Sequence, residues 1–144
     1  MENANEKKLF FKSIFVDLKS VSYEKLDNQN DNNEQIKIVT NDFHNVFNVS
    51  TKGFKILYTR NVELEPKILF EIKVSYEISY EFDEKTIKEY KDNIEELKEL
   101  INIKAEKAIN MTGVVSRASA LISCITLQNN GNALITQPNY SKSK

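Results

Sequence analysis

The stretch Phe70–Phe82, with the sequence FEIKVSYEISYEF, decides the fold expected for this chain. Apolar or aromatic residues occupy every second position, and the positions between them hold Glu, Lys or Ser. Strict alternation places the two sets of side chains on opposite faces of a pleated strand. The stretch is much longer than the usual strand of about five or six residues. We therefore expect an extended sheet that can continue across a subunit boundary.

The segments before this strand also have strand character. Phe10–Tyr23 is rich in Phe, Ile and Val, and Val46–Leu64 forms a second such segment, with Gly53 as a turn or bulge. Ile36–Val39 either begins the second strand or forms a short strand of its own. The polar tract Leu26–Glu34 between the two segments is expected to be a mobile loop.

The hydrophobic period changes after the long strand. Apolar residues now recur at three- and four-residue spacing: Ile87, Tyr90, Ile94, Leu97 and Ile101. This spacing predicts an amphipathic helix from about Asp83 to Ile103. A second helix is expected from about Gly113 to Leu127, with Gly131 available as a left-handed cap. Strands first and helices last predict an α+β fold, a four-stranded antiparallel sheet with two helices packed on one face.

Length and composition define the class of protein. A chain of 144 residues fits one domain, which we place at residues 9–140 between a flexible N-terminus (1–8) and a flexible C-terminus (141–144). Apolar residues make up 40% and charged residues 28%, which is typical of folded rather than disordered chains. The net charge of -1 leaves no basic surplus for nucleic acid. No apolar run approaches the ~20 residues of a membrane span, so no membrane insertion is expected.

The residues that carry catalysis are scarce. His44 is the only histidine and has no nucleophile motif beside it, so we interpret it as a surface side chain rather than a catalytic base. Cys124, the only cysteine, is expected to be a small buried apolar residue on the second helix. No metal-ligand spacing and no glycine-rich phosphate loop are present. The sequence therefore predicts no enzyme, metal or cofactor, and a lone cysteine without an N-terminal apolar leader indicates the cytoplasm.

The apolar face of the long strand has two open interpretations. All seven of its apolar residues can pack beneath the helices as the core of the domain. Alternatively, part of this aromatic surface stays accessible and binds apolar segments of other chains. Burial of apolar surface contributes roughly 25 cal/mol per Å² without demanding a particular sequence, which suits such binding.

Three motifs resemble the SecB family of export chaperones. Ser13–Glu24 looks like the first strand of that family, and Ile68–Ile72 resembles its third strand. Ser116–Gln128 is similar to the family helix in which an Arg precedes an Ile-Ser-x-(Ile/Leu)-Thr run. A Gly turn and a Pro-Asn-aromatic segment follow there, as Gly131 and Pro138–Tyr140 do here. The resemblance covers roughly residues 10 to 140, in matching element order.

The resemblance implies an ATP-independent holdase that binds non-native polypeptides as a homodimer or a dimer-of-dimers tetramer. It also implies a surface that docks the translocase motor SecA, carried over here to Glu24, Leu69 and Glu71. The expected acid at Ser20 is missing, and Gly113–Ser116 replaces a proline-aromatic sequence. These departures suit a divergent SecB-like branch, some of whose members serve toxin-antitoxin systems.

We expect the client to lie in a groove between the long strand and the first helix. The client-facing residues are predicted to be Tyr76, Ile78, Tyr80, Phe82, Ile87 and Tyr90. Two alternatives stay open. The chain can be a dedicated partner of one protein, such as an antitoxin or a phage protein. It can also be a small-ligand-binding or enzymatic α+β domain, which would need a closed pocket holding His44 beside carboxylates.

Overall fold

The computed structural model describes residues 7–26, 37–65, 70–131 and 133–141. Four strands come first: β1 (Phe11–Lys25), β2 (Lys37–Ser50), β3 (Gly53–Glu65) and β4 (Phe70–Phe82). Three helices follow: α1 (Glu84–Tyr90), α2 (Ile94–Met111) and α3 (Val114–Asn130). Most of the polar tract Leu26–Glu34 lies outside the described residues, as does Leu69.

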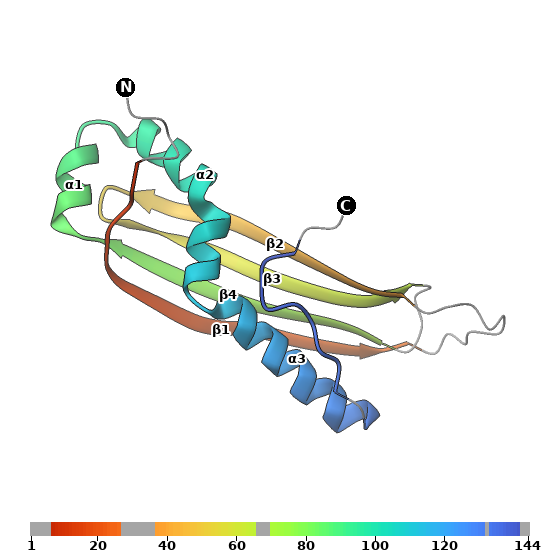
Figure 1. Cartoon of the computed structure of the whole chain (residues 1–144). Coiled ribbons are helices and arrows are strands. Elements are labelled where there is room, and N and C mark those ends of the chain that lie inside the picture. Colours follow the sequence, from red (N-terminus) through yellow and green to blue (C-terminus); the bar gives the residue numbers. More distant parts are fainter. Residues whose placement is uncertain (1–6, 27–36, 66–69, 132, 142–144) are drawn as a thin grey trace.

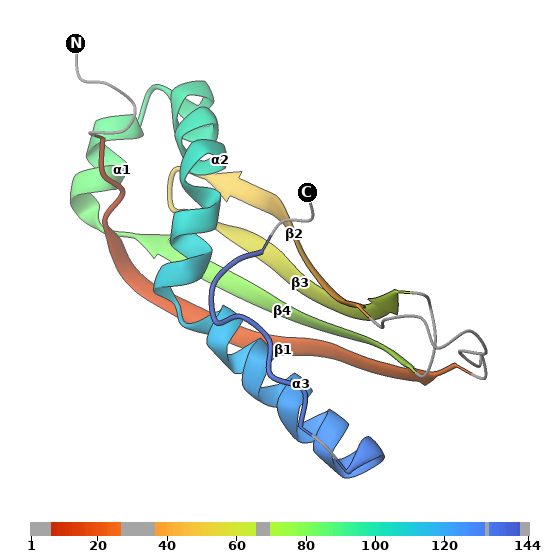
Figure 2. The same cartoon turned by 45° about the vertical axis from the view of Figure 1, so that its right-hand side comes forward.

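The strands form one antiparallel sheet in the order β1-β4-β3-β2. The long strand β4 has the bounds that its alternation predicts, and it lies in the middle of the sheet. Helices α2 and α3 lie over the same face of the sheet, and so does the segment 133–141, called the tail below (Figures 1 and 2). The predicted α+β class, with a four-stranded antiparallel sheet covered on one face, is confirmed.

The segment Val46–Leu64, expected to have strand character with a turn or bulge at Gly53, contains the end of β2 and nearly all of β3. The two strands turn at Thr51 and Lys52. Of the segment Ile36–Val39, Lys37–Val39 supplies the start of β2 rather than a separate strand, and Ile36 lies outside the described residues. Gly53 is the first residue of β3 and lies close to the backbone of β4. A Cβ atom at this position would lie 2.1 Å from the carbonyl oxygen of Tyr80. A side chain at position 53 would collide with the backbone of β4, so the close pairing requires glycine.

The predicted first helix is divided in two. Helix α1 ends at Tyr90, and Asn93 begins α2 by accepting a hydrogen bond from the backbone N–H of Glu96 at 3.3 Å. Asn is a strong N-cap residue, so its side chain favours a new helix start over a continued helix. Asp83 caps the start of α1, because its carboxylate accepts from the Thr86 N–H at 3.0 Å. Gly131 ends α3 with a φ of 76°, as expected.

The core lies between the covered face of the sheet and the helices. The alternating apolar residues of β4 are all buried: Phe70, Ile72, Val74, Tyr76, Ile78, Tyr80 and Phe82. Tyr80 also donates its hydroxyl to the carbonyl oxygen of Ala108 at 2.8 Å, which anchors α2 on the sheet. Cys124 is exposed on α3, so the expectation that it is buried was wrong. It lies on the side of the helix that faces away from Ala118 and Ile122, which are buried.

Candidate functional site

The side chains predicted to face a client are mostly in the core. Tyr76, Ile78, Tyr80, Phe82 and Tyr90 are at most 7% exposed, and Ile87 is half-buried against the same cluster. In this conformation these residues hold α1 and α2 on the sheet and do not line an open groove. The structure thus favours the core interpretation of the β4 face, and a role of these six residues in client binding stays a prediction.

The two described residues predicted to dock a motor protein lie side by side. Glu24 of β1 is paired with Glu71 of β4, and Glu71 is paired on its other side with Glu63 of β3. The row lies on the face of the sheet opposite the buried residues. Like charges directly opposite one another on neighbouring strands destabilise a sheet. The arrangement therefore offers a local negative surface for a basic partner.

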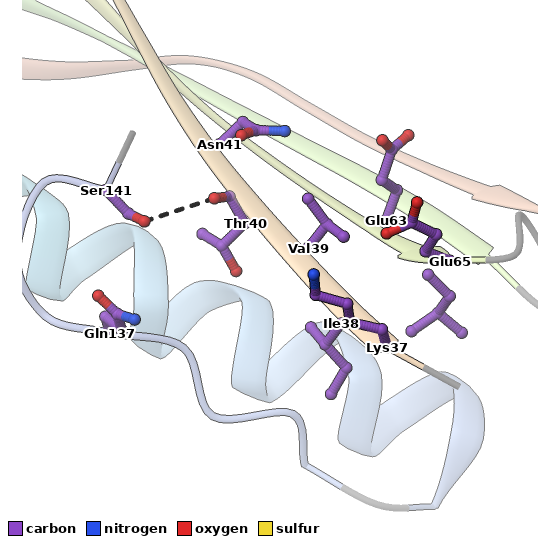
Figure 3. Close-up of a pocket in the computed structure, with 10 residues that line it drawn as sticks. Lys37, Ile38, Val39, Thr40, Asn41, Glu63, Glu65, Gln137 and Ser141 are labelled. Atoms are coloured by element: carbon purple, nitrogen blue, oxygen red, sulfur yellow. Dashed lines mark hydrogen bonds between the residues drawn. The ribbon is translucent and has the colours of Figure 1, made fainter. Parts of the chain in front are cut away.

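A cleft lies at the free edge of β2 (Figure 3). It has a volume of about 700 Å³ and is formed by the start of β2, the end of β3 and the tail. Ile38 and Thr40 point toward the tail, while Val39 and Asn41 point to the other side of the strand. The cleft therefore follows an edge strand, with an apolar side chain, Ile38, that is 49% exposed.

The backbone of β2 has hydrogen-bonding groups on its open side. The Asp42 N–H donates to the carbonyl oxygen of Ser141 at 2.8 Å, and the Asp42 carbonyl accepts from the hydroxyl of Tyr140 at 3.1 Å. Because backbone groups alternate along a strand, Ile38 and Thr40 turn theirs to the same side as Asp42. The tail thus occupies the edge at Asp42, and the Ser141 hydroxyl also donates to the Thr40 carbonyl oxygen at 3.5 Å (Figure 3). The edge continues along the cleft toward Ile38.

A buried ion pair fixes the tail beside this edge. Arg60 is fully buried, and its Nε and Nη2 donate to the two carboxylate oxygens of Asp42, both at 2.8 Å. The guanidinium also donates to the tail. Its Nη1 donates to the Thr136 hydroxyl at 3.0 Å and to the Gln137 carbonyl, and its Nη2 also donates to the Asn139 carbonyl. Burial acts to lower the pKa of Arg60, but the interactions with Asp42 and Tyr58 together outweigh it and raise the pKa. The guanidinium therefore stays charged and binds the tail as a cation.

The alternation of β3 indicates this ion pair, although the pair was not predicted from the sequence. The buried side of β3 alternates through Phe54, Ile56, Tyr58, Arg60, Val62 and Leu64. An Arg at an apolar position of such a pattern needs a buried acceptor. Ser141, expected in a flexible terminus, also belongs to the network, because its N–H donates to the Asp42 carboxylate at 2.6 Å.

His44 belongs to the same neighbourhood. Its Nδ1 lies 2.8 Å from the hydroxyl of Tyr140, and its side chain is half-buried rather than free on the surface. Burial, reinforced by the charges of Glu106 and Asp42, raises the pKa of Tyr140 to about 12, so the phenol is protonated at neutral pH. The pair therefore serves to hold the tail.

The exposed apolar side chains of β1 form a second feature of the sheet. Leu18 and Val21 are 46% and 44% exposed, and they are paired with the buried residues Tyr76 and Val74 of β4. They extend the apolar face of the sheet to its other free edge. We name Leu18, Val21 and their strand edge the β1 shelf.

No group of three or more His, Cys, Asp or Glu is placed to hold a metal ion in the described ranges. Within the same ranges, no single helix is long and apolar enough to cross a membrane.

Comparison with known proteins bears on the architecture. No family model matches the chain, and no curated protein matches it. Among solved structures it is similar to a SecB-like chaperone of Mycobacterium tuberculosis, solved in complex with a ChAD peptide from the HigA1 antitoxin. The similarity covers 87% of this chain and 85% of that chain, with a TM-score of 0.52 and 6% sequence identity. The fold is SecB-like.

The SecB-like fold agrees with the family resemblance of the three sequence motifs. At this low identity the likeness concerns architecture, so the roles of individual residues depend on the geometry described above. That geometry offers two strand edges, a cleft along one of them and an acidic row on the uncovered face. A binding protein can use each of these without catalytic groups.

Proposed function

We propose that this chain is an ATP-independent, non-enzymatic holdase that binds extended segments of non-native polypeptides in the cytoplasm. The observation that carries the proposal is the cleft along the edge of β2. An extended client can add to a strand edge through main-chain hydrogen bonds, which every polypeptide offers, while neighbouring side chains supply apolar contact. The SecB-like fold supports the same class of function.

The tail supports this mode of binding. Residues Tyr140 and Ser141 already use the open side of β2 at Asp42, through the two hydrogen bonds described above. A client strand would continue that pattern along the same edge through the backbone groups of Ile38 and the N–H of Thr40, since the Thr40 carbonyl oxygen already accepts from the Ser141 hydroxyl. The apolar side chains of the client would contact Ile38 and Leu64, the residue of β3 that is paired with Ile38.

The test removes one backbone N–H donor from the edge of β2 without changing the fold. Proline is tolerated on an edge strand when its missing N–H faces away from the sheet, so Thr40→Pro deletes the donor that a client would use. We expect Thr40→Pro to lower protection of several unrelated unfolded clients against aggregation, measured by light scattering. Thr40→Val keeps the N–H and is the matched control. Full protection by Thr40→Pro, with circular dichroism unchanged, would contradict binding at this edge.

A second candidate is a dedicated partner of one protein, such as an antitoxin. The neighbour of the same fold, solved with an antitoxin peptide, favours this alternative. The same assay separates the two, because a dedicated partner protects its cognate protein and leaves unrelated clients to aggregate.

For assembly we propose a homodimer, or a dimer-of-dimers tetramer, that buries the β1 shelf. An unpaired strand edge beside exposed Leu18 and Val21 is a ready surface for a second copy. Mass in solution of the wild type and of Leu18→Glu tests this proposal, since the variant should dissociate.

Delivery of clients for export is the narrower proposal. The acidic row of Glu24, Glu71 and Glu63 supports docking of a basic surface such as one on SecA. Binding of purified SecA should be lost in Glu71→Lys, and equal binding by the wild type and this variant would refute the assignment.

A further inference from the structure

A second cleft lies at the end of the sheet where β1 begins, opposite the end that holds Ile38 at the start of β2. It has a volume of about 220 Å³ and lies between α2 and the segment that precedes β1. Two backbone hydrogen bonds of 3.0 Å hold that segment: the Phe10 N–H donates to the Thr86 hydroxyl, and the Phe10 carbonyl accepts from the Asp83 N–H. Lys7 adds an ion pair to Glu96 of α2. The cleft wall is therefore fixed at several points.

The size of this cleft indicates what it can hold. Pockets for small molecules usually measure about 300–1,000 Å³. A smaller, open cleft suits one large apolar side chain of a longer molecule. Its apolar lining includes Phe10, Ala108 and Met111, and Met111 is 58% exposed. A flexible thioether at the mouth adapts to side chains of different shape.

The charged residues that line the cleft are all lysines. Lys8, Lys104 and Lys107 line it, and Lys85 lies 4.5 Å from the centre of the Phe10 ring. Among the described residues, Lys8, Lys104 and Lys107 form none of the ion pairs of the structure, whereas Lys7 and Lys98 each pair with a glutamate. This positive rim is local, because the chain as a whole has a net charge of -1.

We propose that this cleft binds an apolar side chain of a polypeptide segment whose flanking residues are acidic. The inference rests on the proposed polypeptide-binding function and gives it a sequence preference. The apolar lining takes a Phe or Leu side chain, and the lysine rim attracts the Asp or Glu residues beside it. Such a preference selects among unfolded segments that the β2 edge accepts equally.

Three labelled peptides test the proposal with the full chain. Each contains the same Phe-Leu centre, flanked on both sides by Glu, Gln or Lys, and binding is followed by fluorescence anisotropy. We expect the affinity to fall in the order Glu, Gln, Lys. Added salt should reduce the difference, because exposed charges are screened.

Matched variants assign the preference to this cleft. Lys104→Gln with Lys107→Gln should weaken the Glu-flanked peptide by about 2- to 30-fold, the range for two exposed charge pairs, and should leave the Gln-flanked peptide unchanged. Lys52→Gln with Lys73→Gln removes two exposed charges from the sheet and should change neither peptide. Met111→Ser should weaken all three peptides, since it reduces the apolar lining.

The outcomes separate this proposal from the proposed function. Equal affinity for the three peptides, or no effect of the Lys104 and Lys107 changes, overturns the acidic preference while protection of unfolded clients through the β2 edge can persist. Lysine-dependent binding of dodecanoate without binding of the peptides overturns it in favour of an anionic amphiphile. Conversely, a chain that binds the Glu-flanked peptide but protects no unfolded client keeps this site and refutes the general holdase.

Discussion

Replacement of Asp42 by Asn should destabilise the protein severely. The change keeps the size of the side chain but leaves the fully buried guanidinium of Arg60 without its counter-charge. In the wild type the Asp42 carboxylate accepts from Arg60, the Tyr58 hydroxyl and the Ser141 N–H. Asn replaces one of these acceptor oxygens with an NH₂ group, which can only donate. Breaking a buried ion pair from one side costs about 3–5 kcal/mol.

The cost is large against the total stability of a domain. Domains unfold with about 5–15 kcal/mol, so Asp42→Asn should remove about a fifth or more of the free energy of unfolding. With a urea m-value of about 1–3 kcal/mol per M, the unfolding midpoint should fall by about 1 M or more. Urea titration followed by circular dichroism measures this shift. Amide hydrogen exchange over residues 134–141 should accelerate, because Arg60 also binds the tail.

A double variant separates the charge from the packing. In Arg60→Met with Asp42→Leu no buried charge remains, so this protein should be more stable than Asp42→Asn. Its tail should still exchange quickly, since the carbonyls of Gln137 and Asn139 lose their donor. Asp17→Asn, which alters an exposed carboxylate beside Lys19, is the surface control and should leave the midpoint unchanged. An unchanged midpoint for Asp42→Asn, or a double variant less stable than it, would refute the reasoning.

Two further predictions concern the sheet and the buried phenols. Gly53→Ala should cost about 1–3 kcal/mol by urea titration, because the new Cβ would lie 2.1 Å from the Tyr80 carbonyl oxygen; a neutral effect would mean that β3 and β4 can separate there. Stability should also fall as the pH rises from about 10 toward 12. Burial raises the pKa of Tyr140 to about 12, and also raises the pKa of Tyr58 and Tyr80, so the phenols of the unfolded chain lose their protons first. The contribution of the buried, protonated phenols to stability is thus complete below about pH 10. Tyr140→Phe should make the urea midpoint less dependent on pH between about 10 and 12.

The sequence was most informative where one periodicity decided the structure. The alternation of Phe70–Phe82 predicted the bounds of β4 because a central strand buried on one face leaves no other register. The alternation could not show whether the apolar face was open, since a buried and an accessible face have the same pattern. The helix break at Asn93 was missed because apolar spacing continues through it, and only the cap geometry reveals it.

The candidate site was harder to predict because it combines distant segments. The β2 edge depends on the strand order, in which β1 pairs with β4 and leaves β2 at the margin. The lysine rim joins Lys8 to Lys104 and Lys107, which no local pattern connects. The β1 shelf is the exception. Its residues lie in a stretch that already read as a strand, although only the structure shows how far they are exposed.

The anchored tail has a consequence for the order in which the chain folds. The contact between Asp42 and Ser141 spans 99 positions, so it closes one of the longest loops in the molecule. Contacts of such separation form late, because the entropy of loop closure opposes them until the intervening elements are in place. The β2–β3 and β3–β4 pairings can form first, and during that interval the β2 edge has no cover. During synthesis the chain would therefore expose the β2 edge beside Asp42 until Tyr140 and Ser141 have been made and can pack there.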